Sequence, residues 1–223
     1  MNEKVVVFAL HPDDETLGCG GTLLKHKFYG DEINWVIVTN IFEDQGFKRE
    51  IIERRQNDID IVSKKYNFDR TVKMDLKTTE IDQYSQSFLI SSFSKIINEI
   101  KPSIIYLPFH KDVHSDHRIV FNCIYSCTKS FRYPFIKKIL MMETLSETEF
   151  APALQENAFI PNYFVDISKF FDQKNNIMKI YESEYGEHPF PRSPDNLEAL
   201  ATLRGATAGC RYAESFMCLK DIW

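Results

Sequence analysis

The feature that most constrains the fold is a regular alternation of short apolar runs and longer amphipathic segments over the first two-thirds of the chain. Buried strands are expected at residues 4–10, 33–39, 71–74, 103–108 and 138–144. Helices are expected between them, at residues 17–29, 48–66, 86–100 and 116–130. Alternating strands and helices form a mostly parallel sheet with helices on both faces. The chain is therefore predicted to be an α/β protein, a Rossmann-like three-layer sandwich.

The last third has a different pattern. Loops are expected at residues 145–160 and 185–194, strands at 163–167 and 215–219, and helices at 170–182 and 195–207. We expect this part to form a strand–helix extension packed on the main sheet. A chain of 223 residues suffices for one sizeable α/β domain but barely for two. A single domain over residues 1–223 is therefore predicted.

Composition excludes several classes of function. The formal net charge of −5 argues against a nucleic-acid binder, which would need a basic face. No apolar run approaches the ~18–20 residues of a membrane span, and no signal-peptide pattern is present. Five cysteines without a Cys-x-x-Cys pair suit a reducing compartment, so a cytoplasmic location is expected. Glycine-rich nucleotide-binding fingerprints are also missing.

One imidazole and three carboxylates are crowded into five residues directly after the first expected strand. The sequence there is His11-Pro12-Asp13-Asp14-Glu15. Acidic residues at a helix start can simply cap free N–H groups and oppose the helix dipole. Crowded like charges nevertheless repel one another unless a cation neutralises them. In open α/β sheets ligands lie at the carboxyl ends of strands, so a metal site is predicted here.

A second cluster follows the strand expected at residues 103–108. Three of the six histidines, His110, His114 and His117, fall within eight residues, together with Asp112 and Asp116. For His110 a solvated polar loop is an equally good interpretation. His114 and His117 would flank the start of a helix, on the same sheet edge as His11 if the fourth strand lies near the first.

Imidazole and carboxylate groups suit zinc, and three protein ligands leave a fourth position for water. Zinc acidifies that water and polarises a carbonyl, while a nearby carboxylate can accept the proton. A histidine held by an acid can stabilise an oxyanion or protonate a leaving amine. The two clusters therefore indicate an amide hydrolase.

These motifs resemble those of the PIG-L/LmbE-like family of zinc-dependent N-acetyl sugar deacetylases. The resemblance is carried by residues 11–15 paired with residues 112–117, and it is supported by Arg55 and the closing stretch 204–216. Arg54 is the alternative match for Arg55. The family typically has an Asp-Gly pair after the second strand, where this chain has Thr39-Asn40-Ile41-Phe42.

The resemblance implies roles for individual residues, since spacing alone does not separate Asp13 from Asp14. The metal ligands would be His11, Asp14 and His117. Asp13 would be the general base, and His114 would stabilise the tetrahedral intermediate or act as general acid, oriented by Asp116. The candidate substrate-binding residues are Arg55, Glu15 and Asp112.

The function expected from the resemblance is removal of the N-acetyl group from an amino-sugar conjugate such as an N-acetylglucosamine derivative, with release of acetate. The cofactor would be Zn²⁺, with Fe²⁺ or Co²⁺ as alternatives, and the substrate would be nucleotide- or lipid-linked. A homo-oligomer is also expected. The alternatives are a metal-dependent amidase for a non-sugar amide and a non-catalytic carbohydrate-binding relative. The presence of both Asp13 and His114 argues against the latter.

Overall fold

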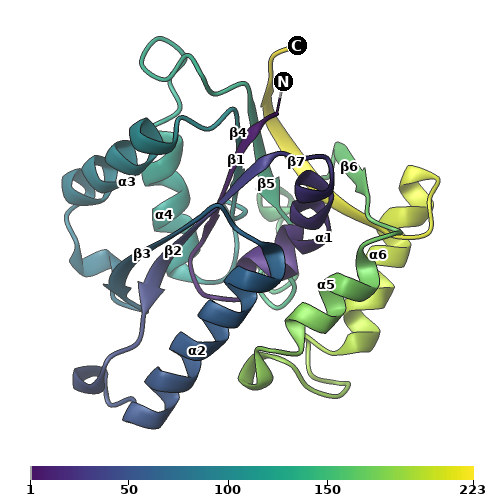
Figure 1. Cartoon of the computed structure of the whole chain (residues 1–223), viewed down its shortest axis with the longest axis horizontal. Helices are drawn as coiled ribbons and strands as arrows, with labels where there is room; N and C mark the ends of the chain where they lie inside the picture. The colour runs from purple at the N-terminus through teal and green to yellow at the C-terminus, as the bar shows by residue number, and fades with distance from the viewer. Residues whose placement is uncertain (1) are drawn as a thin grey trace.

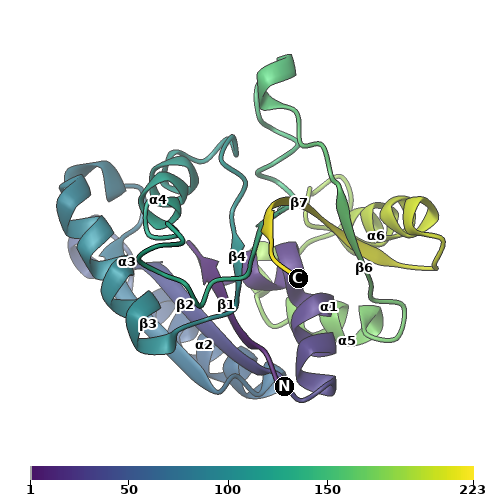
Figure 2. The same cartoon turned by 90° about the horizontal axis from the view of Figure 1, so that it is seen from above.

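The computed structural model describes residues 2–223, and its central sheet contains all the expected strands (Figures 1 and 2). The strands are β1 (Lys4–Ala9), β2 (Glu32–Asn40), β3 (Arg70–Lys77), β4 (Ile104–Leu107), β5 (Lys138–Met142), β6 (Tyr163–Asp166) and β7 (Ala213–Asp221). The helices are α1 (Asp14–Phe28), α2 (Arg49–Tyr66), α3 (Gln86–Ile100), α4 (Ser115–Tyr125), α5 (Phe171–Met178) and α6 (Pro194–Ala208). Short 3₁₀ turns lie at η1 (Glu43–Gln45), η2 (Ile81–Gln83), η3 (Gln155–Asn157) and η4 (Glu182–Glu184).

The central strands are apolar on both faces, so each face needs a covering layer. On one face, Val6 and Phe8 of β1 belong to a core cluster with residues of α3 and α4. On the other, Val5 and Val7 belong to a cluster with residues of α1, α2 and α5. Helices cover both faces in Figure 1, and the predicted three-layer α/β fold is confirmed.

The strand order β3-β2-β1-β4-β5-β7-β6 places β1 between β2 and β4, and all three are parallel. After β1 the chain moves to one side of it through β2 and β3, and it then returns to β4 on the other side. This reversal is a topological switch point, where the loops after β1 and β4 separate and leave a crevice. The two polar clusters of the sequence follow these two strands.

The last third of the chain extends the same sheet. β7 pairs antiparallel with β5, and β6 pairs antiparallel with β7, so the sheet is mostly but not wholly parallel. The expected extension is therefore hydrogen-bonded into the sheet as well as packed on it. The assignment of residues 1–223 to a single domain stays a prediction. Among the described residues, no helix combines the length and apolar character needed to cross a membrane.

Helices α4 and α5 are shorter than the sequence pattern predicts, whereas strands β2, β3 and β7 are longer. The helix expected over residues 116–130 ends at Tyr125, after which the chain turns and buries Tyr133 and Ile136 in the α3–α4 side of the core. The helix expected over 170–182 is reduced to α5. β7 begins two residues before the expected strand because the charged Glu214 is buried inside it, with partners that the local sequence does not reveal.

Glu214 joins β7 to a break in α1. Non-helical backbone at Cys19 frees the N–H groups of Gly21 and Thr22, which donate to Glu214 at 2.8 and 2.7 Å. The buried Lys174 ammonium of α5 lies 2.7 Å from the same carboxylate and also donates to the carbonyl of Leu17. The buried charge pair therefore holds α1, which begins at the candidate site, against α5 and β7.

We expect Glu214→Gln to lower the free energy of unfolding by about 3–5 kcal/mol, because it leaves the Lys174 ammonium buried without a counter-charge. Urea denaturation followed by circular dichroism measures this loss. Glu53→Gln is the control, since it removes an exposed helix ion pair with Arg49 and should leave the denaturation midpoint unchanged. Equal, small effects of the two substitutions would contradict a supporting role for the buried pair.

Candidate metal centre and active site

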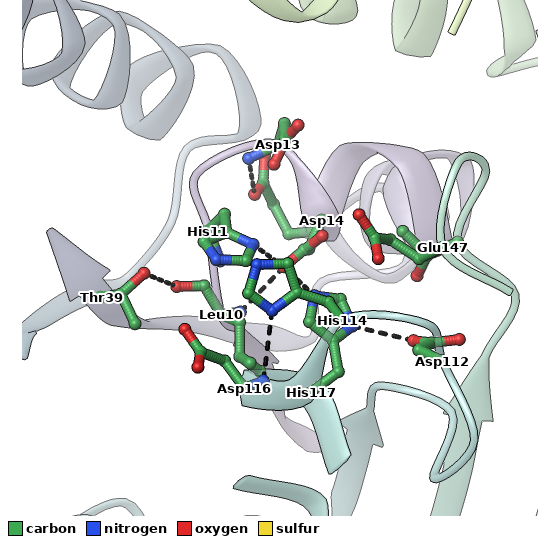
Figure 3. Close-up of polar contacts among 12 residues, drawn as sticks. Leu10, His11, Asp13, Asp14, Thr39, Asp112, His114, Asp116, His117 and Glu147 are labelled. Atoms are coloured by element: carbon green, nitrogen blue, oxygen red, sulfur yellow. Dashed lines mark hydrogen bonds and ion pairs between the residues drawn. The ribbon is translucent and has the colours of Figure 1, made fainter. Parts of the chain in front are cut away.

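The side chains of both sequence clusters converge at the carboxyl ends of β1 and β4 (Figure 3). His11 follows β1, and His117 lies in the first turn of α4, with the two ring centroids 5.5 Å apart. The ring of His114 lies 4.6 Å from that of His11 and 5.5 Å from that of His117. The predicted meeting of the two motifs is therefore observed.

Three of these side chains form a group that could hold a metal ion. One ligand atom each from His11, Asp14 and His117 lies within 4.8 Å of the other two. His11 Nδ1 and His117 Nε2 lie 3.7 and 3.4 Å from Asp14 Oδ2. His117 is fully buried, yet its Nε2 has no hydrogen-bond partner in the described part of the chain. An unpartnered imidazole nitrogen facing a carboxylate fits a divalent cation.

The other nitrogen of His117 is held by a carboxylate. Asp112 Oδ2 lies 2.8 Å from His117 Nδ1, and Asp112 Oδ1 accepts a hydrogen bond from the hydroxyl of Thr148 at 2.7 Å. Metal-binding histidines commonly donate their second N–H to a carboxylate, which fixes the ring and its tautomer. Asp112 therefore orients His117 so that Nε2 faces the other two side chains.

A second group that could hold a metal consists of His11, His114 and Asp116 and shares His11 with the first. The Asp116 carboxylate already accepts a hydrogen bond from the N–H of Thr79 at 2.7 Å. The backbone N–H of Asp116 donates to His114 Nδ1 at 3.2 Å. The contact that orients His114 thus comes from the backbone N–H of Asp116. The sequence suggested that Asp116 orients His114 but did not show whether its side chain or its backbone makes the contact. His110 belongs to neither group, and its ring packs against Phe109 and Phe121.

The electrostatic field of the centre favours positive charge. Burial opposes ionisation of Asp14, but the neighbouring His117 and His11 rings and the hydrogen bond from the backbone N–H of His11 hold the pKa of Asp14 well below its usual range. Burial likewise opposes charging of His117, but Asp14 and Asp112 together raise its pKa well above the usual value. Backbone N–H groups of Leu10 and His11 fix Asp14 Oδ2 at 3.0 and 2.9 Å. Carboxylates that hold a proton on a buried imidazole would also attract a metal cation.

Asp13 is held in an unusual backbone conformation beside this centre. Its φ is 141°, a value that residues with a side chain rarely adopt, and such strain concentrates at functional sites. The side chain is buried, and Oδ2 lies 2.8 Å from Arg192 Nη1. Burial raises the pKa of Asp13 above its usual value even though Arg192 opposes the shift. The carboxyl is therefore adjacent to the metal group without belonging to it.

Two of the three expected substrate-binding residues do not have an open environment. Glu15 is fully buried and hydrogen-bonded to Thr16 and Tyr181, and burial raises its pKa to about 7. Asp112 is also fully buried against His117 and Thr148. Each of these two carboxylates is enclosed by protein groups, and its contact with substrate stays a prediction.

Arg55, rather than Arg54, faces the centre. Burial lowers the pKa of Arg55, whereas the charges of Asp13, Glu184 and Asp14 raise it. Arg54 is exposed. A cavity of about 240 Å³ lies beside Arg55, and its lining includes Pro12, Ile41, Phe47 and Tyr181. A larger cavity of about 570 Å³ lies near the far end of α1, around His26 and Tyr106, away from these groups.

The sequence did not identify two charged residues that complete the site. Glu147, in the loop after β5, is buried beside Asp14, and burial raises its pKa to about 7. Arg192, before α6, contacts Asp13 across 179 residues of sequence. Both residues lie in loops without hydrophobic periodicity, and the weak family likeness of the stretches 143–148 and 188–192 gave neither residue a role.

Comparison with known proteins agrees with this geometry. The family described as "PIG-L: GlcNAc-PI de-N-acetylase" matches residues 5–128, which include both histidine motifs. A diacetylchitobiose deacetylase of Thermococcus kodakarensis is 22% identical over 99% of this chain and 85% of its own length.

Solved structures share the fold. N,N'-diacetylchitobiose deacetylase from Pyrococcus horikoshii has a TM-score of 0.75 at 20% identity, covering 98% of this chain and 84% of its own. GalB, a 4-carboxy-2-hydroxymuconate hydratase from Pseudomonas putida, also has a TM-score of 0.75, at 15% identity, covering 100% of this chain and 98% of its own. The fold alone therefore accompanies more than one reaction.

We expect Asp112→Asn to weaken binding of a divalent metal by about 10–100-fold, because the carboxylate that orients His117 is lost. Asp14→Asn should weaken it further, because an anionic ligand becomes neutral. Competition with a chromogenic chelator measures both affinities. Asp82→Asn, on the exposed turn η2, is the control and should bind like the unaltered protein. Unchanged affinity in Asp14→Asn would exclude this metal group.

Proposed function

The chain belongs to the PIG-L family of de-N-acetylases, and from this premise we propose that it is a metal-dependent hydrolase that removes the N-acetyl group from an amino-sugar conjugate. The family predicted from the two histidine motifs is thereby confirmed. The observation that carries the proposal is the buried, unpartnered Nε2 of His117 facing Asp14 and His11, with Asp13 directly beside them.

In this proposal His11, Asp14 and His117 hold one divalent ion, which we assign as Zn²⁺, with Fe²⁺ or Co²⁺ as alternatives for the same nitrogen and oxygen ligands. The ion supplies Lewis acidity, which polarises an amide carbonyl and acidifies water. Asp13 accepts the proton of the attacking water. The buried position of Asp13 favours this role, because burial raises its pKa and makes it a stronger base than an exposed aspartate.

His114 is proposed to donate a hydrogen bond to the oxygen that becomes negative during attack. A backbone N–H can only donate, so the contact from Asp116 N–H leaves His114 Nδ1 unprotonated. In the neutral ring the proton then lies on Nε2, and burial favours the neutral ring by lowering the pKa of His114. His114 can therefore act as an oxyanion donor without first becoming charged.

In the proposed reaction a single residue, Asp13, both removes a proton from water and delivers one to the leaving nitrogen. Water oxygen bonds to the acetyl carbon, and Asp13 takes one water proton. The bond between the acetyl carbon and the amide nitrogen then breaks, and Asp13 returns the proton to that nitrogen. The second water proton stays on the acetic acid that is formed, which ionises to acetate at neutral pH, and the other product is the free amine.

We assign an N-acetylated amino sugar as the substrate class, which agrees with the family description and with the names of the diacetylchitobiose deacetylase relatives. Arg55 and its cavity are proposed to contact the sugar or its linked group. A nucleotide or lipid linkage and a homo-oligomeric assembly belong to the same proposal. The stretch Thr39-Asn40-Ile41-Phe42, which stands where the family typically has Asp-Gly, would make the sugar contacts there specific to this chain.

We expect the metal-loaded protein to release acetate from at least one N-acetylglucosamine conjugate in a panel of free, nucleotide-linked and lipid-linked sugars. Dialysis against a chelator should abolish release, and Zn²⁺ should restore it. Acetate is measured by a coupled enzymatic assay, and N-acetylated amino acids are included as non-sugar amides. Release from these amides alone would favour the amidase alternative, and binding of the sugars without release would favour the carbohydrate-binding alternative.

Asp13→Asn should reduce kcat by roughly 10²–10⁴-fold, the usual contribution of a positioned general base. Its metal content should match the unaltered protein, because Asp13 is not assigned as a ligand. Metal analysis and acetate release on the same preparation separate the two effects. Loss of metal in Asp13→Asn, with both metal and activity retained in Asp14→Asn, would reverse the two assignments.

A further inference from the structure

One guanidinium group joins three acidic residues from separate parts of the chain. Arg192 Nη1 lies 2.8 Å from Asp13 Oδ2 and also contacts Glu184, while Arg192 Nη2 lies 3.7 Å from Glu147. Arg192 Nε donates to the hydroxyl of Ser146 at 2.6 Å. We call these five residues the Arg192 cluster: Asp13, Ser146, Glu147, Glu184 and Arg192.

The Arg192–Asp13 pair at the centre of the cluster is shielded from water. Only 16% of the Arg192 side chain and 4% of the Asp13 side chain are exposed. Three carboxyl groups this close together repel one another, and the Arg192 guanidinium contacts all three. A planar guanidinium with several donors can contact all three and a hydroxyl at once, which an ammonium cannot.

The backbone around Arg192 is anchored independently of the cluster. The next residue, Ser193, is fully buried, and its side chain caps α6 by accepting from the N–H of Asn196. The N–H of Ser193 also donates to the carbonyl of Phe190. Pro191 further restricts the chain before Arg192. The guanidinium is therefore delivered by a fixed turn, so its position does not depend on Asp13.

The Asp13 side chain, in contrast, depends on Arg192. Within residues 2–223, the contact from Arg192 is the only hydrogen bond made to the Asp13 carboxylate, and it engages Oδ2. The strained backbone of Asp13 sets where the side chain begins, but it does not fix the carboxylate plane. With Oδ2 held by Arg192, Oδ1 stays available to accept a proton.

We propose that Arg192 is the positioning residue for Asp13, which it holds in the orientation needed to take a proton from water. This inference rests on the proposed hydrolytic function. It assigns to the loop before α6 a part in the reaction that its sequence alone does not show. Ser146 and Glu147 act in the same cluster by holding the guanidinium from the loop after β5.

The test is a double-mutant cycle in the full, metal-loaded protein. Arg192→Gln should lower kcat by about 10–100-fold with KM changed less than about threefold, because a misplaced base affects the reacting geometry more than binding. In the Asp13→Asn background the same substitution should cost no more than about twofold further, because the group that it positions is already gone. Arg192→Lys keeps the charge and should recover part of kcat.

Arg204→Gln is the matched control. Arg204 is a similarly shielded arginine, with 19% of its side chain exposed, and it pairs with Glu143 away from Asp13. We expect this substitution to lower the melting temperature while leaving kcat of the folded protein unchanged. Its effect should also be the same with or without Asp13→Asn.

A readout independent of turnover is backbone hydrogen exchange. Arg192→Gln should accelerate it at residues 11–15, whereas Asp13→Asn should leave it unchanged at the independently anchored residues 184–193, with metal content unchanged in both variants. Unchanged exchange at residues 11–15 in Arg192→Gln would overturn the proposal, as would a rise in KM with kcat retained, which indicates substrate contact. Equal kcat losses with and without Asp13 would also overturn it, although the proposed function would survive. If the unaltered protein releases no acetate, the proposed function fails and the positioning role fails with it.

Discussion

The candidate site depends on the parallel pairing of β1 with β4. Val5, Val6 and Val7 lie opposite Ile104, Ile105 and Tyr106, in the centre of the sheet. Because the strands are parallel and in register, the segments that follow them leave the sheet at the same edge. His11 and His117 are separated by a hundred residues of sequence and yet face each other. A shift of this register would separate the two halves of the metal group.

The core supports the centre at an energetic cost. Asp14, Asp112 and His117 are buried polar groups, and such groups are unfavourable unless they are paired. The protein pairs them in a chain, from Thr148 to Asp112 to His117 and on toward Asp14. The last step of that chain lacks a hydrogen bond, since His117 Nε2 has no partner among the described residues. A cation bound between His117 Nε2 and Asp14 would supply the missing partner.

The sequence predicts the strands, the helices and the convergence of the two motifs because each of these follows from local patterns. Apolar runs identify buried strands, and strand ends in a parallel sheet share an edge. The direction in which a motif side chain points cannot be predicted from local patterns, since it depends on the residues that pack around it in the folded protein. Glu15 and Asp112 look like their neighbours in the sequence, but their oxygens turn into the protein interior. Arg192 and Glu147 lie in polar loops without periodicity, and only the closed tertiary structure brings them to Asp13 and Asp14.

The different surroundings of Asp13 and Asp14 explain how two adjacent aspartates can have separate roles. Asp14 accepts hydrogen bonds from two backbone N–H groups and faces two imidazoles, all of which stabilise its anion. Burial disfavours the Asp13 anion, and Arg192 is the cation hydrogen-bonded to it, so the pKa of Asp13 is raised and its proton affinity is higher. Asp14 stays ionised and so remains available as an anionic ligand, but its low pKa makes it a poor base. Asp13, with its raised pKa, can take a proton and return it. His114, neutral with its proton on Nε2, need not supply that proton. For the proposed hydrolysis, these surroundings favour a single proton carrier at Asp13 over a mechanism with separate acid and base.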